Sequence, residues 1–152
     1  MGPGGAGVST YVSQHQVVND LFVLEQSTAS GTDGGGPFTT SMTYTPGAIA
    51  DPAFRACAGQ EWTIPAVTAR SRSAQGQFST STDPGTLKIV AVNEKVTVPA
   101  GTFDTVHYTK TMVSRRGQVL DEFWKSTLHG VTVKRNHSGF GVVATEILQA
   151  VR

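Results

Sequence analysis

The chain has 152 residues, a formal net charge of +1 and a charged fraction of 15%, against about 25% in an average soluble protein. Its length is typical of a single domain, and its balanced charge gives no electrostatic reason to bind nucleic acid or an anionic membrane. No apolar run reaches the roughly 18 residues that a transmembrane helix needs, so we expect no transmembrane segment.

Thr and Val together make up about a quarter of the sequence. Both are β-branched, and their restricted χ1 angles suit a pleated sheet better than a helix. We therefore expect an all-β fold with at most one or two short helices.

Residues 1–7, MGPGGAG, are predicted to be a flexible tail, either a start added for expression or a tether left after an export signal was removed. We expect residues 8–152 to form one β-rich domain. Val8–Ala29 is predicted as one or two extended segments, with a helix over Val17–Leu24 as the alternative. Residues 30–37, SGTDGGGP, are predicted as a flexible Gly-rich loop.

Phe38–Tyr44 alternates in a pattern typical of a strand, and we expect this strand to end at the turn Pro46-Gly47. The segment that follows, DPAFRACAGQ (residues 51–60), predicts a short helix. Asp51 would be its N-cap, Pro52 would occupy the first helical position, and Gly59 lies just past the end.

From Glu61 onward the sequence predicts a run of strands. The first two are polar and alternating, which is typical of an edge strand or a solvated face. The loops between the last four are short, which favours neighbouring antiparallel strands in a meander. The predicted strands cover residues 61–73, 77–82, 87–98, 102–113, 118–126, 131–135 and 139–151.

The loop Ser114–Gly117 has a length that is common in hairpins, and it sets a register for its two strands. This register makes three complementary pairs, each contributing about 0.2 to 1 kcal/mol: Met112 with Val119, Lys110 with Asp121, and Tyr108 with Phe123. A tight turn near Leu128-His129 and a loop over residues 136–139 would then pair Glu122 with Arg135, Trp124 with Val133, and Val133 with Val142.

This pairing predicts large apolar groups on both faces of the sheet. One face would carry His107, Trp124, Val133 and Val142, and the other Met112, Tyr108 and Phe123. A sheet with two apolar faces is either covered on both sides or curled around an interior. We therefore expect a strongly curved antiparallel meander sheet, a half-barrel or another barrel-like form.

The sequence offers no recognisable catalytic or metal site. Cys57 is the only cysteine, so no internal disulfide can form, and we expect it to be a small buried hydrophobic residue. The four histidines show no zinc-binding spacing, and no nucleophile motif is present. Asp121 and Glu122 are adjacent in a strand and would point to opposite faces. We expect no enzyme activity, no metal and no cofactor.

Aromatic residues are the best candidates for a binding surface. They have two interpretations: a packed core, which aromatic residues commonly form, or the lining of a concave sheet that accepts an apolar ligand. The candidate ligand-binding residues are Trp62, Phe103, Tyr108, Phe123 and Trp124.

Three segments carry a resemblance to a known group of proteins. EKVTVPAGTFDTVHY (residues 94–108), EFWKSTLHGVTVKR (residues 122–135) and AGQEWTIP (residues 58–65) resemble a pattern in bacterial cell-envelope proteins of unknown function. That pattern contains a V-x-V-P-A-G-T-F strand entry, and the proteins are similar in type to lipoprotein carriers with a half-barrel fold. The resemblance implies export to the bacterial periplasm or cell envelope, and no known reaction.

Two functions remain open from the sequence. The first is a non-enzymatic exported envelope domain that binds an apolar small molecule, a lipid or an envelope protein on a curved β-sheet. The alternative is a structural or adhesive β module with a filled core and no ligand. Neither involves nucleic acid.

Overall fold

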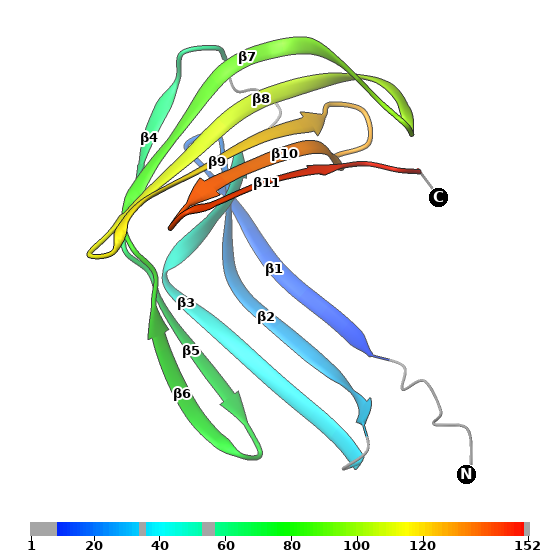
Figure 1. Cartoon of the computed structure of the whole chain (residues 1–152). Helices are drawn as coiled ribbons and strands as arrows, with labels where there is room; N and C mark the ends of the chain where they lie inside the picture. The colour runs from blue at the N-terminus through cyan, green and yellow to red at the C-terminus, as the bar shows by residue number, and fades with distance from the viewer. Residues whose placement is uncertain (1–8, 34–35, 53–56, 151–152) are drawn as a thin grey trace. The chain divides into compact units, whose positions relative to one another are not determined.

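A computed structural model describes residues 9–33, 36–52 and 57–150, and within these ranges the chain is all-β with no helix (Figure 1). The strands form two antiparallel sheets, one of five strands and one of six. The predicted all-β class is confirmed. Neither sheet is closed or strongly curled, so the expectation of one strongly curved half-barrel is wrong.

The chain divides into two compact units, each built on one of these sheets. The division falls inside the segment that we predicted as a single strand over residues 61–73. Pro65 lies at the break between its two halves, where a ring without a backbone N–H interrupts strand pairing. The halves become β4 and β5, which belong to different sheets. The expectation of one domain over residues 8–152 stays a prediction.

The five-stranded sheet has the order β1-β2-β3-β5-β6. The polar segment over residues 77–82 was expected to be an edge strand or a solvated face. It forms β6, which is an edge strand with every residue exposed. Its strands are β1 (Thr10–Val18), β2 (Leu21–Asp33), β3 (Gly36–Pro52), β5 (Thr68–Ser73) and β6 (Gly76–Ser81).

The apolar stretch near the N-terminus is a hairpin, which excludes the alternative of a helix over Val17–Leu24. β1 and β2 pair from Val18 opposite Leu21 outward. Asn19 and Asp20, which connect them, have positive φ angles of 49° and 62°. These are the angles of a type I′ turn, which favours Asn and Asp because both tolerate the left-handed region.

β2 and β3 extend into the expected Gly-rich loop, and β3 is also longer than predicted at its other end. Residues 30–33 are the end of β2 and pair with the start of β3, which includes residues 36–37. Residues 34–35 lie outside the described structure. At the other end, β3 continues through Pro46-Gly47, where its pairing with β2 is irregular. The turn predicted there is wrong.

The predicted short helix is also wrong where the structure can test it. Asp51 and Pro52, its expected first residues, pair with β2 as the last residues of β3. Residues 53–56 lie outside the described residues. Cys57 is exposed, so the expectation that it is buried is wrong. It lies outside the strands, before β4.

The six-stranded sheet has the order β11-β10-β9-β8-β7-β4, so β7 to β11 form the predicted meander. No described segment of the chain forms a helix that could cross a membrane. The strands of this sheet are β4 (Glu61–Ile64), β7 (Gly85–Val98), β8 (Gly101–Ser114), β9 (Gly117–Ser126), β10 (Thr132–Gly139) and β11 (Val142–Ile147).

The predicted register of β8 against β9 is confirmed throughout. Tyr108 pairs with Phe123, and the two other predicted pairs, Lys110 with Asp121 and Met112 with Val119, are also present. Ser114 and Gly117 form a further pair, so the connection is shorter than the four residues predicted.

The predicted register of β9 against β10 is wrong by one residue. Trp124 pairs with Lys134 and not with Val133. The pairing shifts between Thr132 and Lys134, so that Val133 is the extra residue of a bulge, which displaces every later pair. Nearer the turn, Lys125 opposite Thr132 and the hydrogen bond from the Ser126 N–H to the Val131 carbonyl at 2.8 Å still follow the predicted register.

The predicted loop over residues 136–139 is strand. β10 runs to Gly139, which pairs with Val142, and the turn is Phe140-Gly141, with φ angles of 51° and 79°. Val142 therefore shares a face with Met112 and not with Trp124, contrary to our expectation.

Candidate functional site

The structure places all five predicted ligand-binding residues in the six-stranded sheet, but on different faces. Tyr108 and Phe123 point to the same face, which we call the Tyr108 face. Their rings stack with centroids 5.0 Å apart and planes 16° apart. Leu87 and Ile89 of β7 are fully buried on this face beside Tyr108. This part of the predicted site is packed core.

Trp124 points to the opposite face, which we call the His107 face. Its ring stacks on that of His107 at 4.1 Å, and the Lys134 ammonium lies 4.6 Å from its centroid. These neighbours leave Trp124 only 7% exposed. The indole therefore offers little surface to a ligand.

The other two predicted residues lie on different strands, Trp62 on the edge strand β4 and Phe103 on the inner strand β8. Trp62 is half-buried on the edge strand β4, opposite Leu87. Phe103 lies near the start of β8, where its ring meets that of His129 edge-on at 6.1 Å. The five aromatic residues thus form no common lining.

The His107 face carries a polar cluster that sequence reasoning missed. The Glu94 carboxylate accepts one hydrogen bond from the Trp124 indole N–H and lies 3.1 Å from His107 Nδ1. On the other side of the imidazole, Nε2 lies 3.5 Å from a Glu122 oxygen, without hydrogen-bond geometry. Glu122 in turn accepts from Asn136. This cluster ties four adjacent strands together by side chains.

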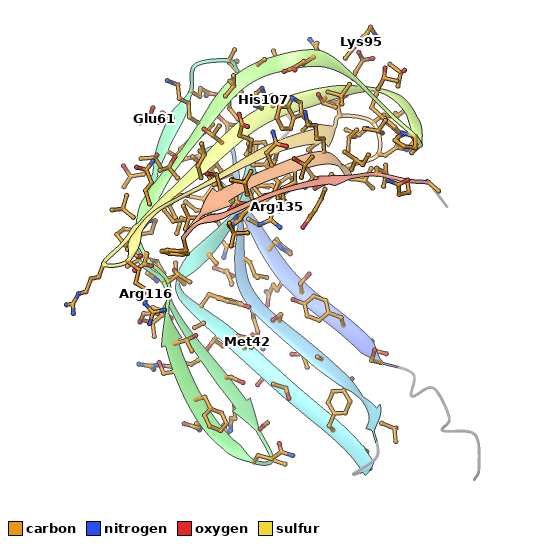
Figure 2. All side chains as sticks on the ribbon, viewed as in Figure 1. Met42, Glu61, Lys95, His107, Arg116 and Arg135 are labelled. Carbon is orange, nitrogen blue, oxygen red and sulfur yellow. The ribbon has the colours of Figure 1, made fainter. Side chains whose placement is uncertain are left out.

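A second polar cluster lies on the Tyr108 face, centred on Asp121. Its carboxylate accepts two hydrogen bonds from Arg135, at 2.8 and 3.1 Å, and lies 2.9 Å from His137 Nδ1. Arg135, marked in Figure 2, also lies 5.4 Å from the Phe123 centroid. The sequence pairs Arg135 with the wrong carboxylate, Glu122, because the bulge at Val133 is not visible in the sequence.

Neither cluster is placed to hold a metal ion. Within the described ranges, no group of three or more His, Cys, Asp or Glu side chains is placed to hold a metal ion. The carboxylates of both clusters already accept hydrogen bonds from their neighbours. We interpret the clusters as structural cross-strand contacts.

The hollows described in the two units do not match the predicted aromatic lining. One, of about 570 Å³, lies on the five-stranded sheet around Arg70 and Arg72. A second, of about 260 Å³, lies between β9, β10 and β11. The third, of about 170 Å³, has Phe103 in its wall and is the one hollow among these that a predicted aromatic residue lines.

The edge strand β1 is the best candidate for a surface that binds a protein partner. All nine of its residues are exposed, so side chains on both of its faces are bare. Four of them are large and apolar, and they are 44% to 65% exposed: Tyr11, Val12, Val17 and Val18. The sequence TYVSQHQVV carries no Lys, Asp, Glu, Pro or Gly. This composition could have marked the segment as a candidate for strand pairing, but the sequence alone does not show that β1 lies at the edge of its sheet.

Comparisons of this chain with protein-family models, with curated proteins and with solved structures find no match.

Proposed function

We propose that this chain is a non-enzymatic, exported module of the bacterial cell envelope that attaches to a protein partner by strand addition at β1. The observation that carries the proposal is the exposure of β1 over its whole length at the end of its sheet. The envelope location is supported by the resemblance of residues 58–65, 94–108 and 122–135 to envelope proteins.

An edge strand presents a row of unpaired backbone N–H and C=O groups, which can pair with an added strand. Proteins usually prevent this with Lys, Pro, short strands or bulges. β1 has nine residues and contains neither Lys nor Pro, and its one irregularity lies between Gln14 and His15. Strand addition would therefore meet little built-in resistance.

The side chains of β1 indicate the chemistry of the partner. Apolar residues at both ends of β1 flank a polar, formally uncharged centre, Ser13–Gln16. A second copy of β1 has this same character. An antiparallel copy centred on Gln14 would place Tyr11 opposite Val17, an aromatic and β-branched pair of the kind that stabilises sheets. We take a second copy of this chain as the partner to test first.

This proposal selects the partner-binding interpretation over lipid carriage. A lipid chain needs an enclosed apolar lining. The aromatic residues expected to supply it are divided between the two faces of the six-stranded sheet, and Tyr108 is buried in its core. The absence of a shared aromatic lining among these residues favours a module that acts through its edge.

The test compares two double variants of the full chain. Val12→Lys/Val17→Lys places charges on β1. The matched control, Val90→Lys/Val113→Lys, makes the same substitutions at exposed valines of the inner strands β7 and β8. Sedimentation velocity measures association, and hydrogen exchange measures the protection of amides in residues 10–18. We expect wild type and control to associate with rising concentration and to gain β1 protection, whereas the β1 variant does neither.

A fluorescent peptide of residues 10–18 serves as an independent probe of the edge. A wild-type chain that neither associates nor binds this peptide would rule out the proposal. Association that survives both lysines in β1 would do the same. Saturable binding of a fluorescent fatty acid without peptide binding would instead support the apolar-ligand function.

A further inference from the structure

The five-stranded sheet carries an open groove of about 570 Å³ on strands β3, β5 and β6, which we call the Arg70 groove. Its lining includes a set of polar side chains that share one face of the sheet: Ser41, Thr43, Arg70, Arg72, Gln77 and Ser79.

The register places each arginine at the centre of a row of polar side chains. Arg70 pairs with Thr43 of β3 and with Ser79 of β6. Arg72 pairs in the same way with Ser41 and Gln77. Directly paired residues of an antiparallel sheet point to the same face about 5 Å apart. Each guanidinium is therefore flanked on both sides by groups that hydrogen-bond.

The positive charge of the groove is not compensated within the described part of the chain. Arg70 and Arg72 are both exposed, and the structure gives neither of them an ion pair among the described residues. Among the described side chains in the strands of this sheet, the carboxylates are those of Glu25 and Asp51, and neither is a cross-strand neighbour of either arginine.

We propose that the Arg70 groove binds a linear acidic polysaccharide. Arg70 and Arg72 are two residues apart on one strand, which separates their Cα atoms by about 6.8 Å. Two anionic groups along an extended chain could each engage one guanidinium, which binds oxyanions with two parallel hydrogen bonds. The hydroxyls of Ser41, Thr43 and Ser79 both donate and accept hydrogen bonds, as sugar hydroxyls require.

The same features disfavour two other ligand classes. The residues that line the groove include one large apolar side chain, Phe78, and no aliphatic residue, which is too little apolar surface to hold a lipid tail. A nucleic acid backbone carries a dense row of phosphates and is bound by extended basic surfaces. The chain has a net charge of +1, and the groove holds two arginines, which do not make an extended basic surface of that kind.

This site is separate from the β1 edge. β5 and β6 lie at the opposite end of the sheet order from β1. Substitutions of the two arginines should therefore leave strand addition at β1 unchanged, and the two proposals can fail independently.

The experiment measures binding of the full chain by isothermal titration calorimetry. The two acidic probes are polygalacturonate, which carries carboxylates, and dextran sulfate, which carries sulfates. Neutral dextran and a single-stranded oligonucleotide are the comparison probes. The test variant is Arg70→Gln/Arg72→Gln, with Arg70→Lys/Arg72→Lys as a second variant that keeps the charge. The matched control, Arg115→Gln/Arg116→Gln, removes two charges at the β8–β9 turn, from which Arg116 projects outward (Figure 2).

We expect wild type and the Arg115/Arg116 control to bind at least one acidic polymer equally well and neutral dextran weakly or not at all. Each Arg→Gln change should weaken binding about tenfold, which corresponds to about 1.4 kcal/mol. The lysine variant should bind with intermediate affinity, because it loses the paired hydrogen bonds and keeps the charge. Which acidic polymer binds more tightly identifies the anion.

Three results would overturn the proposal. The first is equal loss of affinity in the Arg115/Arg116 control, which would indicate a nonspecific charge effect. The second is undiminished binding by a glutamine variant whose circular dichroism and urea midpoint match those of wild type. The third is tighter binding of a single-stranded oligonucleotide than of either acidic polysaccharide, which would assign the groove to nucleic acid.

Discussion

The stack of Tyr108 on Phe123 provides a quantitative test of the six-stranded sheet. Tyr108 is 1% exposed, and its ring lies 5.0 Å from that of Phe123. Truncating a fully buried large aromatic residue costs about 3–5 kcal/mol, so we expect Tyr108→Ala to lower the free energy of unfolding by about 4 kcal/mol. Phe123 is half-buried, and Phe123→Ala should cost about half as much, roughly 2 kcal/mol.

A double-mutant cycle separates the stack from burial. Stacked aromatic pairs contribute about 0.5–1.5 kcal/mol beyond the area that they bury. The Tyr108→Ala/Phe123→Ala variant should therefore lose about 1 kcal/mol less than the sum of the two single variants. Urea denaturation followed by circular dichroism measures all four free energies of unfolding.

The control cycle combines Tyr108→Ala with Val113→Ala. Val113 lies on the same strand, five residues further along, and is 57% exposed. Distant sites without shared partners are additive within about 0.5 kcal/mol, so this pair should show no coupling. A coupling between Tyr108 and Phe123 that is no larger than that of the control pair would refute the stack and the register on which it depends.

Two further substitutions test the charged cluster and the packing of β7 on β8. Asp121→Ala removes the acceptor of hydrogen bonds from Arg135 and should lower the free energy of unfolding by about 2–3 kcal/mol. Asp104→Ala breaks an exposed ion pair and should lower it by less than about 1 kcal/mol. Equal urea midpoints for the two variants would contradict this difference. Gly85→Ala should cost about 1–3 kcal/mol or more, because its Cβ would overlap the carbonyl oxygen of Thr111; an unchanged midpoint would show that β7 lies further from β8.

Where the sequence predicts the fold correctly, the deciding information is local. The hairpin of β8 and β9 has a short connection, and its strands hold complementary pairs that a one-residue slip would separate. The Tyr108–Phe123 pair follows from these two facts alone. The β-branched composition predicts the all-β class for a similarly local reason, since it acts through the χ1 preference of each residue.

Where the prediction fails, the deciding contacts join residues that are distant in the chain. The bulge at Val133 transfers the pairing of Trp124 to Lys134, and no local pattern in the sequence marks it. The helix signal at Asp51 and Pro52 is a real local preference, but both residues pair with β2 instead. Tertiary pairing overrides local propensity in such cases.

The sequence by itself determined that this protein is made of strands, and it determined the register of one hairpin, because these depend on side-chain preference and short loops. Only the tertiary structure decided which strands are edges, which faces carry the aromatic residues, and that Arg70 and Arg72 lie between hydroxyl-bearing strands. An edge exists only where no further strand pairs, and pairing joins segments that are far apart in sequence. Both proposed binding surfaces therefore depend on that arrangement.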